Sequence, residues 1–181
     1  TINLTTDQLS IDKNLTINGG SGVTVTRQAG SQNFRIFTIA SGSTVILDGL
    51  IISNGNAASD SGGGIANAGT LTLRNSTVSG NTANGIGGGI SNTGTFKRDR
   101  THITSNHADF SGGGIGQVDG GILDLRNSLI DGNSSTRDGG GLTSQSILVN
   151  ANVMIVNCTF ANNTAGTYAG AILNVATGAG T

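Results

Sequence analysis

The side chains best suited to chemistry gather in one short stretch, FKRDRTH, at residues 96–102. Histidine transfers protons near neutral pH, and arginine binds anionic groups with a planar fork of donors. The stretch holds Arg98, Arg100 and His102 at alternate positions, so these three are the candidate catalytic residues. Its lysine and two arginines also form the only basic cluster in the sequence.

The sequence lacks the residue patterns of glycoside hydrolases and of calcium-binding repeats. Glycoside hydrolysis needs two carboxyl groups at a defined separation, and the 10 acidic residues are mostly isolated. The two histidines, His102 and His107, lie in RTHITSNHADF without neighbouring glycines or paired acids. Calcium-binding nonapeptide repeats need Gly-Gly-x-Gly-x-Asp, and GGGIAN lacks the acid. We therefore expect no bound metal and no cofactor, and we favour a protein that is not an enzyme.

The composition narrows the classes of fold and partner. The chain has 181 residues with 31 glycines and no proline, yet 35% of its residues are hydrophobic. This combination favours a packed fold punctuated by glycine over a disordered chain. A formal net charge of −1 gives no long-range field for nucleic acid or an acidic membrane surface, so we expect neither partner. No apolar run reaches the roughly 18 residues of a membrane span, and the single cysteine, Cys158, cannot form an internal disulfide.

Two sequence elements recur in the same phase along most of the chain. One is GGG followed by an aliphatic residue, and the other is a four-residue element such as VSGN or ITSN. Both recur every 25 to 30 residues, so chance does not explain them. The first element ends at Ile65, Ile90, Ile115, Leu142 and, in the form AGAI, at Ile172; the second ends at Asn81, Asn106, Asn133 and Asn163.

Short runs within each period, such as TLTLRN and ILDLRN, alternate apolar and polar residues, which is the pattern of strands. A period of 25 residues with Gly and Asn at the corners is typical of stacked coils. The sequence therefore predicts an all-β, right-handed, single-stranded parallel β-helix of about seven coils with no substantial helix. We expect one domain over residues 1–181, with irregular coils at 1–43 and regular coils at 44–181, cut from a longer repeat array.

Stacked coils place residues one period apart side by side, which predicts columns of inward side chains. Burial of each such side chain contributes about 1.5–3 kcal/mol. Arg98 is the one intruder among the apolar residues, and burying an unpaired guanidinium is costly, so we expect a local bulge that turns it out to solvent. The columns are Val45, Leu71, Phe96, Leu123 and Val153; Leu47, Leu73, Arg98, Leu125 and Ile155; and Ile52, Val78, Ile103, Ile130 and Phe160.

Outward positions form columns of a second kind. One of them alternates in charge from coil to coil, and opposite charges on adjacent strands favour one register by a few tenths to about 1 kcal/mol per pair. At the corners, an asparagine ladder is expected, and the glycines of GGG are expected at positive φ. The charged column is Asp48, Arg74, Asp99 and Arg126, with Lys97 beside Asp124 in the next column; the ladder is Asn75, Asn127 and Asn157.

The paired elements GGGI and FANN resemble the GGA(I/L/V) and FxxN repeats of chlamydial polymorphic membrane proteins and of related bacterial surface proteins in the pectin-lyase-like superfamily. The opening TINLTTDQLSIDKNLTINGG is similar to their first coils, so the resemblance covers nearly the whole chain. It implies a β-helix that is secreted or displayed on the outer membrane as a scaffold, adhesin or autotransporter passenger. Its implied partners are a host or cell-surface protein or a polysaccharide. The chain departs from this family pattern in two ways. The second full repeat lacks the inward leucine and the ladder asparagine, and the aromatic residue of FxxN occurs only at Phe160.

Two other functions stay open. Pectate lyases share this fold and use an arginine as base beside calcium-binding acids, so the resemblance allows a polysaccharide lyase or glycoside hydrolase that uses residues of FKRDRTH. Ice binding needs a long row of threonines, but the row of Thr44, Thr70 and Thr95 is ended by Gly121 and Ala151. Exposed terminal coils would also allow copies of the chain to associate end to end.

Overall fold

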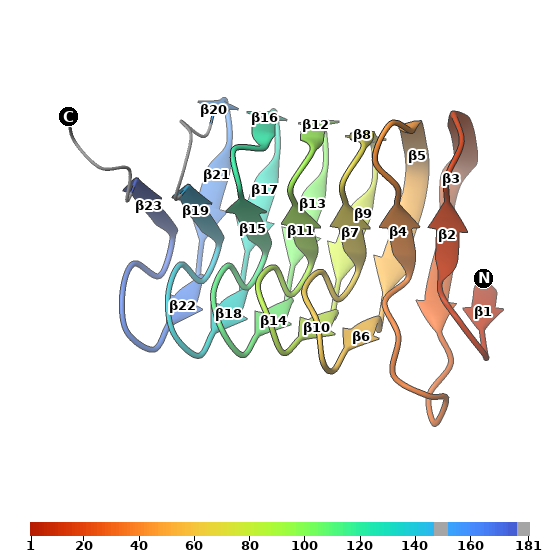
Figure 1. Ribbon diagram of the computed structural model, residues 1–181, viewed down its shortest axis with the longest axis horizontal. Coiled ribbons are helices and arrows are strands. Elements are labelled where there is room, and N and C mark those ends of the chain that lie inside the picture. Colours follow the sequence, from red (N-terminus) through yellow and green to blue (C-terminus); the bar gives the residue numbers. More distant parts are fainter. Residues whose placement is uncertain (147–151, 177–181) are drawn as a thin grey trace.

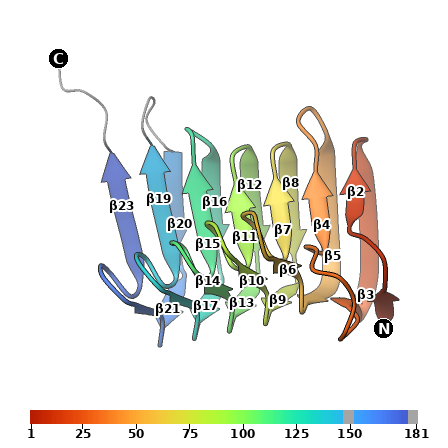
Figure 2. The ribbon, with the colours of Figure 1, turned by 60° about the horizontal axis from the view of Figure 1, so that its bottom comes forward.

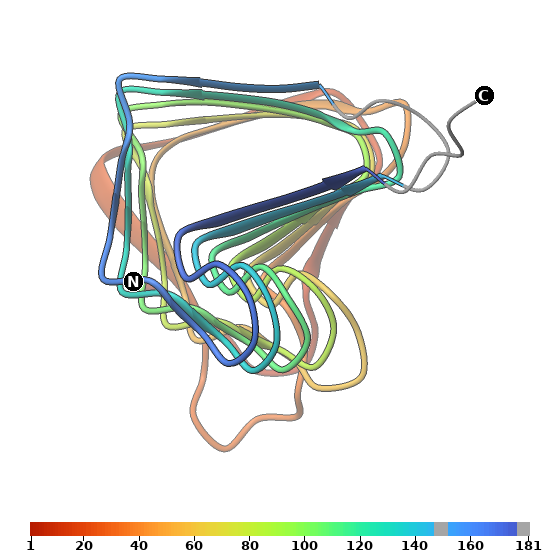
Figure 3. The same cartoon turned by 90° about the vertical axis from the view of Figure 1, so that its left-hand side faces the viewer.

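The computed structural model describes residues 1–146 and 152–176, and these residues form strands, turns and loops without a helix. Successive turns of the chain stack along one axis, from β1 (Ile2–Leu4) to β23 (Ile172–Ala176) (Figure 1, Figure 2). Viewed along that axis, the turns superimpose around a common interior (Figure 3). In the part of the chain that the structure describes, no helix is long and apolar enough to cross a membrane.

Three sheets form the walls of this stack. The largest has eleven strands: β1, β3 (Leu15–Arg27), β5 (Thr44–Ser53), β8 (Thr70–Arg74), β9 (Thr77–Ser79), β12 (Thr95–Asp99), β13 (His102–Thr104), β16 (Ile122–Arg126), β17 (Leu129–Asp131), β20 (Asn152–Val156) and β21 (Thr159–Ala161). The second has seven: β2 (Leu9–Ile11), β4 (Phe37–Ile39), β7 (Ile65–Asn67), β11 (Ile90–Asn92), β15 (Ile115–Val118), β19 (Leu142–Ser146) and β23. The third has five: β6 (Asn56–Ala57), β10 (Thr82–Ala83), β14 (His107–Ala108), β18 (Ser134–Ser135) and β22 (Thr164–Ala165).

Each strand pairs in parallel with its equivalent one turn away, as β8 does with β12 and β7 with β11. The second sheet receives one strand per turn, so six full turns separate β2 from β23. This architecture is a parallel β-solenoid, and it confirms the all-β class, the parallel stacking and the lack of helix in the described residues. Its right hand stays a prediction.

The predicted inward columns are confirmed by the strand register. Leu71 lies between Val45 and Phe96, and Ile52 lies beside Val78. Because each side chain is covered by its equivalents in the turns above and below, the central members lose all contact with solvent. The completely buried members are Val45, Leu47, Ile52, Leu71, Leu73, Val78, Phe96, Ile103, Leu123, Leu125 and Ile130.

A ladder of asparagines runs inside the solenoid, formed by the last residues of the VSGN-type elements. Asn106 Nδ2 donates to Asn133 Oδ1 (2.9 Å) and to the Val78 carbonyl (3.0 Å). One turn earlier, Asn81 Nδ2 donates to Asn106 Oδ1 (2.9 Å) and to the Ile52 carbonyl (3.1 Å). The backbone N–H of Asn81 also donates to Asn106 Oδ1 (3.1 Å). The repeat element in the sequence therefore marks a buried ladder, which sequence reasoning did not predict.

The glycine triplets occupy a corner where each turn approaches the next. The first glycine of a triplet has positive φ, as at Gly87 (φ 74°), but Gly88 does not. A Cβ on Gly88 would instead overlap the carbonyl oxygens of His107 and Gly113 in the next turn. The prediction of positive φ is therefore right for the first glycine of the triplet only, and close backbone approach explains the second.

The threonine row is as short as predicted, although it ends on a different residue. Thr70 pairs with Thr44 and with Thr95, as expected. The next neighbour of Thr95 is Ile122 rather than Gly121, because the longer third period places its additional residues in the connection before β16. Ala151, the next predicted member, lies outside the described residues.

Candidate functional site

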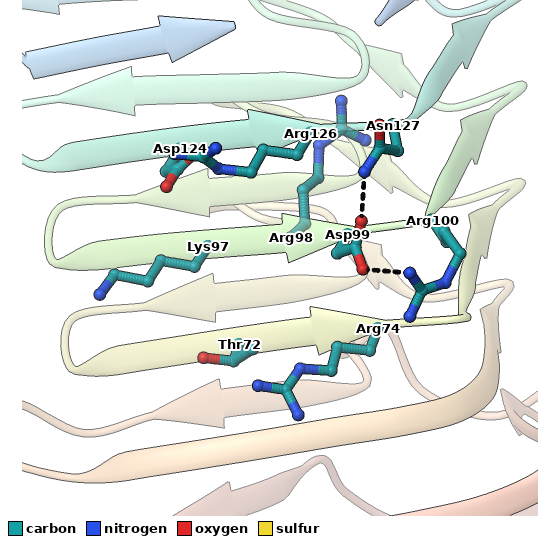
Figure 4. Close-up of a pocket in the computed structure, with 9 residues that line it drawn as sticks. All are labelled: Thr72, Arg74, Lys97, Arg98, Asp99, Arg100, Asp124, Arg126 and Asn127. Atoms are coloured by element: carbon teal, nitrogen blue, oxygen red, sulfur yellow. Dashed lines mark hydrogen bonds and ion pairs between the residues drawn. The ribbon is translucent and has the colours of Figure 1, made fainter. Parts of the chain in front are cut away.

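A depression lies on the outer face of the eleven-stranded sheet (Figure 4). We call it the charged face. It spans three consecutive turns, because its side chains come from β8, β12, β16 and the corners that follow them. Five of the nine lysines and arginines of the chain line it. Its residues are Thr72, Arg74, Lys97, Arg98, Asp99, Arg100, Asp124, Arg126 and Asn127.

The alternation of strand β12 positions the side chains at the centre of the charged face. Phe96 is completely buried and Arg98 is 2% exposed, whereas Lys97 between them is exposed to solvent. In the register, Lys97 lies beside Asp124 on one side and Thr72 on the other. The predicted pairing of the Lys97 and Asp124 positions is therefore confirmed.

The alternating outward column is also confirmed as a register. Asp99 lies between Arg74 and Arg126, and Arg74 in turn lies beside Asp48. The ion pairs do not follow that column, however. Arg126 Nε donates to Asp124 Oδ1 (2.9 Å) two residues earlier on its own strand. A same-strand carboxylate on the same face is as accessible to a long arginine as one across the ladder, so the predicted inter-turn pairs give way to local ones.

The second local ion pair joins Asp99 to Arg100. Their Oδ2 and Nη1 atoms are 2.6 Å apart. Asp48, the column neighbour of Arg74, accepts a hydrogen bond from Asn75 Nδ2 instead (2.8 Å). In residues 1–146 and 152–176, Arg74 and Lys97 make no salt bridge. The charged face thus carries two exposed cations that have carboxylates at neighbouring register positions but form no direct salt bridge with them.

The predicted corner ladder of Asn75, Asn127 and Asn157 is interrupted. Asn157 Nδ2 donates to Asn127 Oδ1 (2.7 Å), as a ladder requires, but Asn127 Nδ2 donates to Asp99 Oδ1 (2.8 Å). Arg100 occupies the ladder position of the intervening turn and donates from Nε to Asn75 Oδ1 (2.9 Å). Arg100 adopts the same left-handed backbone as the asparagines, with φ 50° against 46° for Asn75.

The prediction that Arg98 turns out to solvent is wrong. Strand β12 pairs with both neighbours at every residue, so no bulge reverses its alternation. The side chain extends from β12 toward β16 (Figure 4). None of its three guanidinium nitrogens has a hydrogen-bond partner in the described part of the chain. Burial lowers the pKa of Arg98 to about 10, and the nearby Cys158 opposes part of that shift.

The three candidate catalytic residues do not converge. Arg98 points into the solenoid, Arg100 lies outside at the corner, and His102 belongs to β13 beyond that corner. His102 lies between Thr77 and Leu129, and its buried Nε2 has no hydrogen-bond partner among the described residues. Within that same part of the chain, no group of three or more His, Cys, Asp or Glu residues is placed to hold a metal ion.

A smaller polar group lies on the N-terminal turns. Arg35 forms an ion pair with Asp60, and Thr38 Oγ1 donates to Gln8 Oε1 (3.1 Å). Partial burial raises the pKa of Asp60, but the Ser61 N–H and the Arg35 guanidinium outweigh it and lower the pKa below its usual value. Every charge in this group is paired, so it has less capacity for a charged ligand than the charged face.

The sequence columns locate the centre of the charged face but do not identify its residues as one continuous surface. The columns already placed Arg74, Lys97 and Arg126 on outward positions of consecutive turns, which is the signal for a shared basic face. The alternation of charge in the column favours register-setting pairs instead. Comparison of the chain with protein-family models, curated proteins and solved structures found no match.

Proposed function

We propose that the chain is a non-catalytic β-solenoid scaffold, secreted or displayed on the outer surface of a bacterial cell, which binds a partner in the manner of an adhesin. The observation that supports this proposal most is the charged face. Three stacked turns hold its side chains at a spacing of about 4.8 Å on one wall, and that rigidity pre-organises a binding surface without any moving part. The sequence resemblance to polymorphic membrane proteins supports the same function.

The rival function, a carbohydrate-active enzyme of the pectin-lyase type, has less support. It depended on Arg98 as a base, and that side chain is 2% exposed, while His102 does not line the charged face. A base must reach the proton that it abstracts. Ice binding is supported less still, because the threonine row ends at Ile122 on its C-terminal side.

Three measurements test the proposal. Incubation with pectin and polygalacturonate, with and without calcium, should give no unsaturated product and no new reducing ends; either product would overturn the non-catalytic function. Protease treatment of intact producing cells should degrade the protein, which places it outside. A screen of immobilised glycans and host surface proteins should give saturable binding. An absence of saturable binding across the screen would contradict an adhesin.

A further inference from the structure

The distribution of charge on this protein is uneven in a way that its net charge hides. Lysines and arginines number 9 against 10 acidic residues. The charged face holds five of those cations but only two acids, Asp99 and Asp124. One cation, Arg98, points inward, so the surface of the face presents four cations against two carboxylates, with the carboxylate of Asp48 beside Arg74 at its edge. A local positive field therefore exists on one wall of a nearly neutral molecule.

The two cations without a salt bridge, Arg74 and Lys97, lie on adjacent turns. Lys97 is opposite Thr72 in the register, and Arg74 is two residues further along the same strand as Thr72. Residues two apart on a strand point to the same side. Arg74 and Lys97 therefore project from one face of adjacent turns, and Figure 4 shows both side chains on the exposed wall.

We propose that the charged face binds an anionic polysaccharide, meaning a sugar polymer that carries carboxylate or sulfate groups. Arg74 and Lys97 bind its anionic groups, because neither forms a salt bridge with the carboxylates beside it in the described residues. This inference rests on the proposed function, since it names the class of ligand that the surface scaffold binds.

The neutral and acidic members of the charged face favour a sugar polymer over a nucleic acid. The hydroxyl of Thr72, the amide of Asn127 and the partly exposed carboxylate of Asp99 can exchange hydrogen bonds with sugar hydroxyls. A nucleic acid duplex presents a charge about every 1.7 Å, so it would bring more anionic groups against Asp99 and Asp124 than a polymer with one charged group per sugar does. The lining also contains no aromatic side chain on which bases would stack.

The decisive experiment compares polymers on one protein. Binding of fluorescently labelled dextran sulfate and polygalacturonate is measured at low salt by anisotropy, with neutral dextran and double-stranded DNA as comparison polymers. We expect one or both anionic polysaccharides to bind, with an affinity that falls as salt is added. The dextran sulfate and polygalacturonate arms distinguish sulfate from carboxylate recognition. Neutral dextran should not bind.

Matched variants test the location of the site. The double variant Arg74→Gln with Lys97→Gln should bind the polysaccharide about five- to tenfold more weakly, because it removes two exposed charge contacts. The control, Lys13→Gln with Arg137→Gln, removes the same charge from exposed positions outside the charged face and should keep the wild-type affinity. Thermal unfolding of the Arg74 and Lys97 double variant should match the wild type, since both side chains are exposed. The control variant loses the contact of the Arg137 guanidinium with the Phe110 ring (4.1 Å to the ring centroid), so its unfolding temperature should fall by a few degrees at most.

Each remaining outcome decides between the two proposals. Equal weakening by both double variants would overturn the site, because net charge alone would then explain binding. Tighter binding of DNA than of either polysaccharide, or no polymer binding, would overturn the ligand class and leave the scaffold function standing. Cleavage of a polysaccharide during the assay would overturn the non-catalytic function instead.

Discussion

Asn106 and Asn133 lie one turn apart inside the solenoid, with Asn106 Nδ2 donating to Asn133 Oδ1 over 2.9 Å. Both side chains are almost completely buried, at 1% and 0% exposure. A buried amide without partners is expensive, so a chain of amides that satisfy one another holds the turns in register. The apolar columns supply most of the burial energy, and this ladder specifies which turn lies on which.

Replacement of Asn106 by alanine should lower the free energy of unfolding by about 3 kcal/mol or more. The substitution removes four side-chain hydrogen bonds, so the Asn81 backbone N–H loses its acceptor and the Val78 carbonyl loses the Asn106 donor. Asn81 Nδ2 keeps only its bond to the Ile52 carbonyl. Denaturant unfolding followed by circular dichroism measures the loss. Asn84→Ala, at an exposed position, is the control and should stay within about 0.5 kcal/mol of wild type. Equal effects of the two substitutions would contradict a structural role for the ladder.

Replacement of Arg98 by leucine should stabilise the protein by about 1–4 kcal/mol. It exchanges a buried guanidinium without hydrogen-bond partners for the residue found at Leu73 and Leu125, its neighbours in the column. The unfolding temperature should rise by about 2–4 °C for each kcal/mol gained. Lys97→Leu, on the exposed side of the same strand, should give no comparable gain. A lower unfolding temperature for the Arg98 variant would show that the buried charge has a partner.

The pH dependence of stability should differ between wild type and the Arg98→Leu variant. Burial lowers the pKa of Arg98 to about 10 in the folded state, below its value in the unfolded chain. The unfolded chain therefore binds more protons above about pH 10, and wild-type stability gains with rising pH relative to the variant. The stability gap between the two proteins should be constant from pH 6 to about 9 and narrow above pH 10. Thermal unfolding at matched ionic strength measures the gap, and a gap that widens would refute the assignment.

Replacement of Gly88 by alanine should cost about 3 kcal/mol or more, because the added methyl group overlaps backbone carbonyls of the next turn that cannot move independently. Gly42→Ala is the matched control. Gly42 has φ 83° but open space around its Cβ position, so alanine there incurs only the left-handed backbone strain of about 1–2 kcal/mol. Gly88 lies outside the left-handed region, so its loss reports the overlap between turns, whereas the loss at Gly42 reports backbone strain alone. A loss at Gly88 no larger than that at Gly42 would contradict the close approach of the turns.

The register of the solenoid followed from the sequence because its signal is repeated. Asp48, Arg74, Asp99 and Arg126 fall in line across four consecutive turns, as the period required. A stacked fold makes sequence spacing equal to spatial adjacency, so one alignment of the repeats predicts most contacts. The inward columns run through five consecutive turns, so a shift of one residue in any strand would move its apolar side chains to the outer face.

Side-chain direction and pairing did not follow in the same way. The cost of burying Arg98 suggested a bulge, yet residues 95–99 contain no additional residue relative to 70–74, and that equal length was the signal for uninterrupted alternation. The choice of Arg126 for Asp124 rather than Asp99 depends on rotamers, which a pattern of residue types does not encode. The asparagine at the end of each VSGN-type element is visible in the sequence as a repeat. Its hydrogen-bond partner, the equivalent asparagine of the next turn, is evident only from the structure.

The backbone of Arg100 has a consequence for how such walls diversify. The turn that contains Arg100 has an arginine at the corner where its neighbours have asparagine, and Arg100 keeps a similar φ. The buried ladder through Asn106 is intact in the same turn. The outer corner residue of a turn can therefore change without a change in the buried ladder, and a whole turn carries its own outward side chains with it. Binding surfaces in this architecture would then evolve by duplication and exchange of whole turns rather than by changes in the shape of a cleft.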